Sequence, residues 1–189
     1  MESISESNIK DKINYIFFDW SGTLGDAKCR ECYFIGKFEK AMKPETMCVM
    51  KALKMLDIPM GIITNTKYTL KDVEGSINHS TSPLKDYFNI IISSGDPGNP
   101  RKPDPAIYDL GIKKLSFEKK LSFEKKNIMY VGNNYTKDFL SSLEHGMQAA
   151  VLDPKGEYSD PKYQKEKGYI IKNLWDLIPI VIKHNNIDL

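Results

Sequence analysis

Four polar side chains in this sequence follow short apolar runs and are of types that bind or attack anionic groups. They are Asp19, Thr64, Lys102 and Asn133, and each lies at or just beyond the end of a run typical of a β-strand. A carboxylate can act as a nucleophile toward phosphorus. An ammonium, a hydroxyl and an amide can neutralise or hydrogen-bond phosphate oxygens. The placement of these residue types at strand ends is therefore the first indication of a functional site.

The elements that position these side chains alternate along the chain. Apolar runs predict strands at Ile13–Phe18, Met60–Ile63, Phe88–Ile92, Asn127–Val131, Ala149–Leu152 and Tyr169–Ile171. Amphipathic spacing predicts helices at Pro44–Leu56, Tyr68–Ile77, Ala106–Leu115, Thr136–His145 and from Leu174 onward. Since the strands are continuously apolar, we expect an α/β Rossmann-like three-layer sandwich with a mainly parallel central sheet of five to six strands. Ligands of such sheets bind at the carboxyl ends of the strands.

Composition and length fit one domain without a strongly charged partner. The chain has 189 residues and a net charge of +2, which indicates neither nucleic acid nor an anionic membrane as a partner. We expect residues 1–12 to form a flexible tail and residues 13–189 a single domain. The N-terminus lacks an apolar signal segment, no run is long enough to span a bilayer, and the cysteine count of 3 is odd. These features favour a cytoplasmic protein with reduced thiols.

Two further patterns have simple interpretations. Cys29 and Cys32 form a lone CxxC, and because no second pair exists we favour unlinked thiols over a zinc or redox site. The hexapeptide Lys113–Glu118 recurs immediately as Lys119–Glu124, which we interpret as a tandem duplication that lengthens the helix or loop before the fourth strand.

Four segments together resemble the motifs of the haloacid dehalogenase (HAD) superfamily, in the family's order. They are Phe17–Leu24, Ile62–Asn65, Arg101–Pro105 and Tyr130–Asp138. The resemblance covers roughly Tyr15–Asp153 and implies a Rossmann-like core that works through an aspartyl-phosphate.

The resemblance also implies a role for each residue of the first and fourth motifs. Asp19 would be the nucleophile. A hard divalent cation, Mg²⁺, would be held by the Asp19 carboxylate, the Ser21 carbonyl and the side chain of Asp138 or Asn133. Without this context, Asp19 could simply cap a turn, and Asp138 could be an exposed residue early in a helix.

The other motif residues would surround the phosphate. Lys102 would neutralise the phosphoryl oxygens and hold the nucleophile, and Thr64 and the Asn65 amide would donate hydrogen bonds to the same oxygens. Gly22 would let the backbone turn tightly around the phosphate. Taken alone, Thr64-Asn65 could be an ordinary turn and Lys102 a solvated lysine.

Two positions depart from the family pattern. The family's second Asp, which protonates the leaving group and then activates water, is Ser21 here, and the first Asp of the fourth motif is Asn133. A Ser hydroxyl cannot supply acid–base help worth about 10²–10⁴-fold near neutral pH. The site also lacks two negative charges, so we expect weak binding of divalent metal.

The first motif is closest to that of phosphonate-cleaving relatives, which need a lysine from a helical cap. The interval from Thr23 to Thr64 already contains the Pro44–Leu56 helix and is too short for such a cap. We therefore expect a cap-less HAD-like hydrolase, possible oligomerisation, and hydrolysis of small or macromolecular phosphomonoesters, slow because of Ser21. The alternative is a catalytically inactive domain that binds a phosphorylated ligand or a protein partner.

Overall fold

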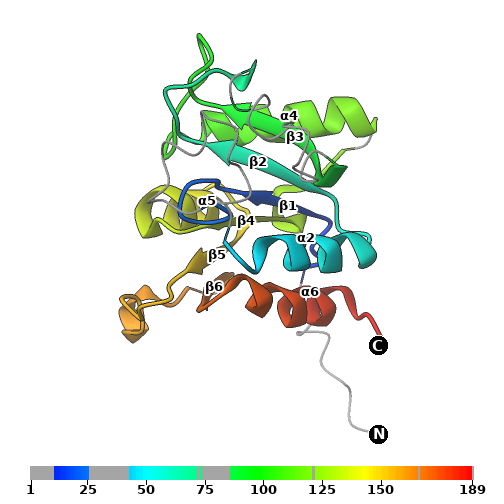
Figure 1. Cartoon of the computed structure of the whole chain (residues 1–189), viewed down its shortest axis with the longest axis vertical. Helices are drawn as coiled ribbons and strands as arrows, with labels where there is room; N and C mark the ends of the chain where they lie inside the picture. The colour runs from blue at the N-terminus through cyan, green and yellow to red at the C-terminus, as the bar shows by residue number, and fades with distance from the viewer. Residues whose placement is uncertain are drawn as a thin grey trace, which may run out of the picture.

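The structure is a computed structural model, and it forms one parallel sheet between two layers of helices (Figure 1). It describes residues 11–25, 43–71, 73, 86–120, 122–165 and 167–188. The CxxC pair, half of the helix expected at Tyr68–Ile77 and residues 1–10 of the expected tail lie outside these ranges. Asp11 lies within them, and its backbone carbonyl accepts a hydrogen bond from Gln148 Nε2 at 3.0 Å.

The sheet has six strands, all parallel, in the order β3-β2-β1-β4-β5-β6. The strands are β1 (Tyr15–Phe18), β2 (Met60–Thr64), β3 (Phe88–Ser93), β4 (Ile128–Gly132), β5 (Gln148–Leu152) and β6 (Gly168–Ile171). Strands covered on both faces read as continuous apolar runs, which is why each was visible in the sequence. This order has a switch point between β1 and β4, where the connections turn in opposite directions and ligands of such folds bind.

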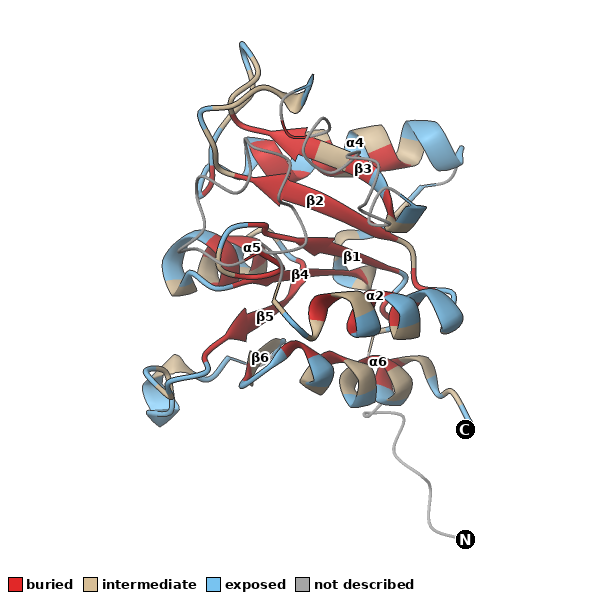
Figure 2. Cartoon of the chain, viewed as in Figure 1, coloured by how far each residue is buried: buried red, intermediate tan, exposed pale blue. Residues whose placement is uncertain are grey.

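Helices cover both faces of the sheet, so the expected three-layer α/β architecture is confirmed. The helices are α2 (Thr46–Met55), α4 (Ala106–Lys119), α5 (Ser141–Glu144) and α6 (Leu177–Asn185), with 3₁₀ turns at Lys125–Asn127, Pro161–Tyr163 and Leu174–Asp176. Buried side chains of α2 and α6 pack with Ile16 and Phe18 on one face. Those of α4 pack with Tyr15 and Phe17 on the other. Figure 2 shows the resulting pattern of buried strands and exposed outer helix surfaces.

The helix expected at Thr136–His145 has a different form. Residues Tyr135–Leu140 form a π-helix, η4, and only Ser141–Glu144 continue as α-helix. The Phe139 amide donates to the Asn134 carbonyl five residues earlier, at 3.3 Å. This wider turn buries two consecutive side chains, Asp138 and Phe139. Gly132 permits the approach, since a Cβ there would lie 2.3 Å from the Asp138 Cβ.

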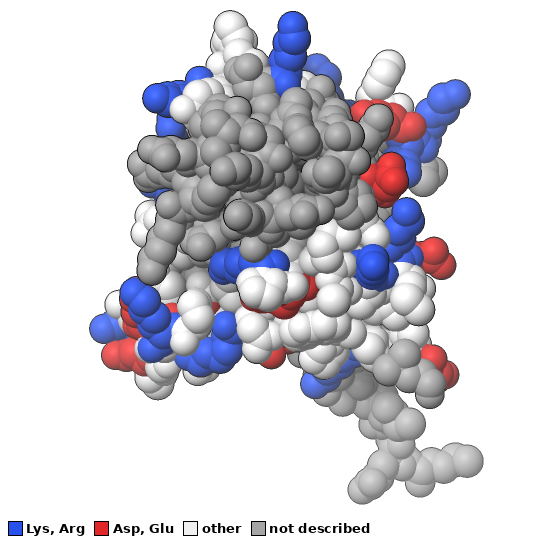
Figure 3. Space-filling view, viewed as in Figure 1, with Lys and Arg blue, Asp and Glu red and all other residues white. Residues whose placement is uncertain are grey.

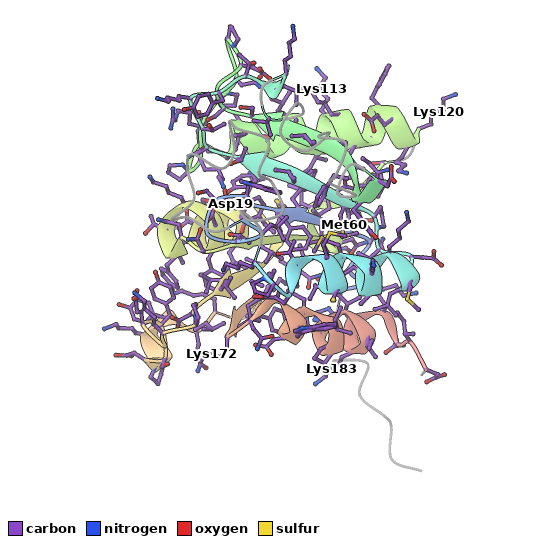
Figure 4. All side chains as sticks on the ribbon, in the orientation of Figure 1. Asp19, Met60, Lys113, Lys120, Lys172 and Lys183 are labelled. Carbon is purple, nitrogen blue, oxygen red and sulfur yellow. The ribbon has the colours of Figure 1, made fainter. Side chains whose placement is uncertain are left out.

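The two hexapeptide copies adopt different conformations. Lys113–Glu118 lies within α4, where Leu115 is fully buried. In the second copy Lys120 takes a left-handed conformation, with φ of 53°, and ends the helix. The chain then leads to the amino end of β4. This end of the strands is opposite to their carboxyl end, where Asp19 lies. Figure 4 labels Lys120 at the far end of α4 and Asp19 beside α5.

Candidate active site

The structure brings the sequence-identified polar residues together at the carboxyl edge of the sheet. Asp19 follows β1, Thr64 ends β2, Lys102 lies on the loop before α4, and Asp138 lies on η4. All four are buried, with exposed fractions of 7%, 4%, 3% and 2% respectively. Buried polar groups need partners, so the contacts among these side chains define the site.

The Lys102 ammonium lies between two carboxylates and a phenol. Its Nζ donates to Asp19 Oδ1 at 2.7 Å, to Asp138 Oδ1 at 2.7 Å and to the Tyr130 hydroxyl at 2.6 Å. A lysine ammonium has three donors. All three donors are therefore used, so the position of the ammonium is fixed.

Two residues that hold Lys102 were not assigned this role from the sequence. The Asn65 side chain pairs with the Lys102 backbone in both directions, donating to its carbonyl at 2.8 Å and accepting from its amide at 3.0 Å. The Asn65 side chain, expected among the phosphate donors, is thus engaged with the lysine loop. Tyr130 lies in the middle of the apolar run of β4, and nothing in the spacing of that run marks its hydroxyl as part of a polar site.

Burial and charge shift the pKa values of the central groups. Burial alone would lower the pKa of Lys102, but the charges of Asp19 and Asp138 outweigh it and raise that pKa above its ordinary value. Burial raises the pKa of Asp19 to about 6; Lys102 opposes this rise and Asp138 adds to it. Lys102 therefore stays charged, and Asp19 ionises close to neutral pH.

The second oxygen of Asp19 lies on the side of Thr23 and Asn133. Asp19 Oδ2 accepts a hydrogen bond from Thr23 Oγ1 at 3.3 Å, and the same hydroxyl lies 3.4 Å from Asn133 Oδ1. Gly22 has φ of +87°, and a Cβ there would lie 2.4 Å from Asn133 Nδ2. Ser21, on the same turn, is exposed, as is Asn133. Among the described residues, the contacts of this half involve no charged group besides Asp19.

The donors on this side suit a hydrated Mg²⁺. The described residues contain no group of three or more His, Cys, Asp or Glu side chains able to hold a metal. Both oxygens of Asp138 already have partners, because Oδ1 accepts from Lys102 and Oδ2 from the Asn134 amide at 2.9 Å. Mg²⁺ commonly binds through one or two carboxylates and retains several waters. Asp19, the Asn133 amide oxygen and the Ser21 carbonyl form such a donor set.

A cavity of about 180 Å³ lies beside this half of the site. Its lining residues are Gly22, Lys43, Asn133, Leu152, Asp153, Pro154, Lys155, Glu157 and Tyr158. The Asp153 carboxylate fixes the loop after β5 by accepting from the amides of Glu157 at 2.8 Å and Tyr158 at 3.0 Å. The face in Figure 3 shows basic and acidic atoms mixed along its coloured margins. The cavity is thus preformed and carries both signs of charge.

The fold and these contacts define a Rossmann-like α/β protein with a buried lysine–carboxylate cluster at the switch point of its sheet. Comparison with protein families gives the particular family. The chain belongs to the haloacid dehalogenase-like hydrolase family, whose model matches residues 28–146. That segment includes Thr64, Lys102 and Asp138, whereas Asp19 lies before it.

Individual relatives agree with this assignment. The chain is 25% identical over 137 residues to haloacid dehalogenase-like hydrolase domain-containing protein 3 of Danio rerio. The match covers 72% of this chain and 50% of that protein, so the chain spans about half the length of its relative. No helix among the described residues is both long and apolar enough to cross a membrane.

Solved structures share the fold at low sequence identity. The putative HAD-hydrolase YfnB of Bacillus subtilis, solved bound to magnesium, superposes with a TM-score of 0.72 and 13% identity, covering 90% of this chain and 99% of that one. A HAD phosphatase of Thermococcus onnurineus gives a TM-score of 0.66 and 18% identity, covering 89% and 98%. These similarities confirm the HAD-type architecture predicted from the four motifs.

Proposed function

We propose that this chain hydrolyses phosphomonoesters slowly, with a divalent cation, through an aspartyl-phosphate on Asp19. The observation that carries the proposal is the arrangement of the two Asp19 oxygens. Oδ1 is held by Lys102 at 2.7 Å, whereas Oδ2 makes the longer contact with the Thr23 hydroxyl at 3.3 Å, on the side of Asn133. A carboxylate oriented in this way presents one oxygen to an incoming phosphorus.

The reaction would proceed in two displacements at phosphorus. Asp19 Oδ2 attacks, a bond forms between Oδ2 and phosphorus, and the bond to the leaving alcohol breaks as that alcohol takes a proton from solvent. Water then attacks the acyl-phosphate, which releases inorganic phosphate and restores the carboxylate. Lys102 contacts Asp19, and Thr64 ends the neighbouring strand β2; both side chains would stabilise negative charge during both displacements.

A bound Mg²⁺ would screen the negative charges of the nucleophile and the phosphoryl group from each other. Asp19, Asn133 and the Ser21 carbonyl would hold it. Because only one of these donors is charged, we propose weak binding. The magnesium seen in the Bacillus subtilis relative supports the choice of ion.

The substrate is a phosphorylated small molecule or macromolecule, whose non-phosphate part would enter the cavity beside Asn133. The cavity volume of about 180 Å³ suits a small group or the phosphorylated residue of a larger one. The similarity of the fold to the HAD phosphatase of Thermococcus onnurineus supports this substrate class.

Ser21 provides the decisive test, because it stands where the family has its acid–base Asp. We expect wild-type turnover of a generic aryl phosphate to be slow. Ser21→Asp should raise it by up to about 10²–10⁴-fold, the range typical of acid–base catalysis. Steady-state phosphatase assays would compare both proteins with Asp19→Asn as the blank. Ser122→Asp, which adds the same charge at an exposed position on the opposite edge, is the matched control.

A second candidate is a non-catalytic domain that binds a phosphorylated ligand or partner. The uncharged, exposed Ser21 and Asn133 favour it, because they remove the groups that activate water and strengthen metal binding. If every variant stays at the level of the blank while remaining folded, the hydrolase proposal fails. Phosphate binding that persists in those variants would then support the binding domain.

A further inference from the structure

Tyr130 is the buried side chain that joins the lysine to the neighbouring strand end. It has no exposed surface. Its hydroxyl accepts from Lys102 Nζ at 2.6 Å and donates to the Ile63 carbonyl at 2.8 Å. Burial raises the pKa of this phenol well above its ordinary value, so it keeps the proton that it donates. Both hydrogen-bonding roles of the hydroxyl are therefore used.

Because of the position of Tyr130 in the sheet, its two hydrogen bonds link different segments of the same site. Strand β1 lies between β2 and β4 in the sheet. A hydroxyl from β4 that reaches Ile63 of β2 therefore spans the end of the strand that leads into Asp19. Ile63 immediately precedes Thr64, so one hydroxyl ties Lys102 to the segment carrying Thr64.

The hydrogen bonds of Lys102 show what the phenol contributes. Two of its three donors go to the two carboxylates and the third to Tyr130. Without the phenol, the third donor would lack its acceptor at a fully buried position, and an unsatisfied buried donor is unfavourable. The ammonium would then rotate or shift toward another acceptor, and its contact with Asp19 Oδ1 would no longer be fixed.

We propose that Tyr130 is a positioning residue that fixes the Lys102 ammonium on Oδ1 of Asp19, so that Oδ2 remains the attacking atom. Tyr130 acts through Lys102 and need not touch the substrate. The orientation of Lys102 follows from the geometry alone, while its effect on turnover rests on the proposed hydrolase function.

The test is Tyr130→Phe, which removes the hydroxyl and keeps the ring. The first measurement is the proton–nitrogen NMR signal of the Lys102 ammonium in metal-free protein at pH 6. An ammonium with three buried hydrogen bonds should exchange slowly and give a signal that disappears in Lys102→Met. We expect this signal to broaden or vanish in Tyr130→Phe, because one of the three bonds is lost.

The second measurement is turnover of an aryl phosphate, made in the Ser21→Asp background so that rates are high enough to compare. Tyr130→Phe should lower kcat by about tenfold, the order expected when a hydrogen bond to a charged group is lost. KM should change by less than about twofold, because the affected interaction orients the nucleophile rather than binding the ground state.

Tyr108→Phe is the matched control. Tyr108 is also fully buried, and its ring packs edge-on against Tyr130 with centroids 5.2 Å apart. Its hydroxyl donates to the Lys137 carbonyl at 2.8 Å, and the three donors of Lys102 go to other groups. We expect this variant to lose stability while keeping the ammonium signal and kcat.

The outcomes separate the two proposals. An unchanged ammonium signal in folded Tyr130→Phe overturns the positioning role, whatever the activity. An altered signal with no turnover in any variant supports the positioning role and defeats the hydrolase proposal. If Tyr130→Phe does not fold, 3-fluorotyrosine can be placed at position 130. It retains the ring and the hydroxyl but is a weaker hydrogen-bond acceptor, so the ammonium signal should change. An unchanged signal in that protein would also overturn the positioning role.

Discussion

The two halves of the site differ in how completely their polar atoms are paired. Around Lys102, every donor of the ammonium has an acceptor within 2.7 Å, and the groups come from four different segments of the chain. Around Asn133, the two contacts made by Thr23 are 3.3 and 3.4 Å long, and Ser21 and Asn133 are exposed.

This difference indicates which part of the proposed chemistry the geometry supports. The half around Lys102, which we call the paired half, orients a carboxylate and supplies a positive charge, so its geometry is fixed before any ligand arrives. The half around Ser21 and Asn133, which we call the open half, would hold a cation and activate water. Both tasks depend on negative charge that Ser21 and Asn133 do not carry. Substitutions can therefore change one half of the site separately from the other.

Lys102→Met should have the largest effect, because it removes the one cation that contacts both carboxylates among the described residues and leaves two buried carboxylates facing each other. Breaking a buried ion pair in this way costs about 3–5 kcal/mol. Urea unfolding should show this loss, and turnover should fall to the level of Asp19→Asn. Lys51→Met on the exposed surface of α2 is the control, with an expected change below about 0.5 kcal/mol. A loss no larger than that of the control would mean that the paired half contributes little to stability.

Asn133→Asp should strengthen the open half. It restores a charged oxygen beside Asp19, and we expect Mg²⁺ to bind at least about tenfold more tightly in calorimetric titrations. Asn134→Asp adds the same charge one residue further on, where Asn134 is exposed and caps η4, and should leave the affinity unchanged. Equal gains in the two variants would indicate a general charge effect rather than a ligand at position 133.

The smallest expected effect is a change in the titration of Asp19. In metal-free protein, carbon-13 NMR of its carboxyl should give a midpoint at about 6. Since this pKa lies above the unfolded value of about 3.9, the group's contribution to stability is present at low pH and is lost as pH rises through about 6. Asp138→Asn should lower the midpoint, because the charge of Asp138 raises it. An unchanged midpoint in that variant would show that the two carboxylates do not interact.

The sheet could be predicted from the sequence because its strands are buried on both faces. Each apolar run maps onto a strand within about two residues at its ends, as for Phe88–Ile92 and the observed Phe88–Ser93. The convergence of Asp19, Thr64 and Lys102 also followed from the fold, because carboxyl ends of parallel strands share one edge.

The sequence could not show how these residues contact one another. Tyr130 lies among apolar neighbours in β4, so its spacing predicts only packing, and its hydroxyl meets Lys102 through the sheet order. The Asn65 side chain pairs with a backbone segment far along the chain. The π-helix at Tyr135–Leu140 was also missed, because apolar periodicity over so few residues does not distinguish it from an α-helix.

The repeated hexapeptide offers a practical use at the opposite end of the molecule. The first copy lies within α4, and the second begins at Lys119, the last residue of that helix. The exposed end of α4, remote from Asp19, is a suitable place for a peptide tag or a fluorophore. A label inserted after Lys120 would report on unfolding or immobilise the protein while leaving the approach to the carboxyl edge of the sheet open.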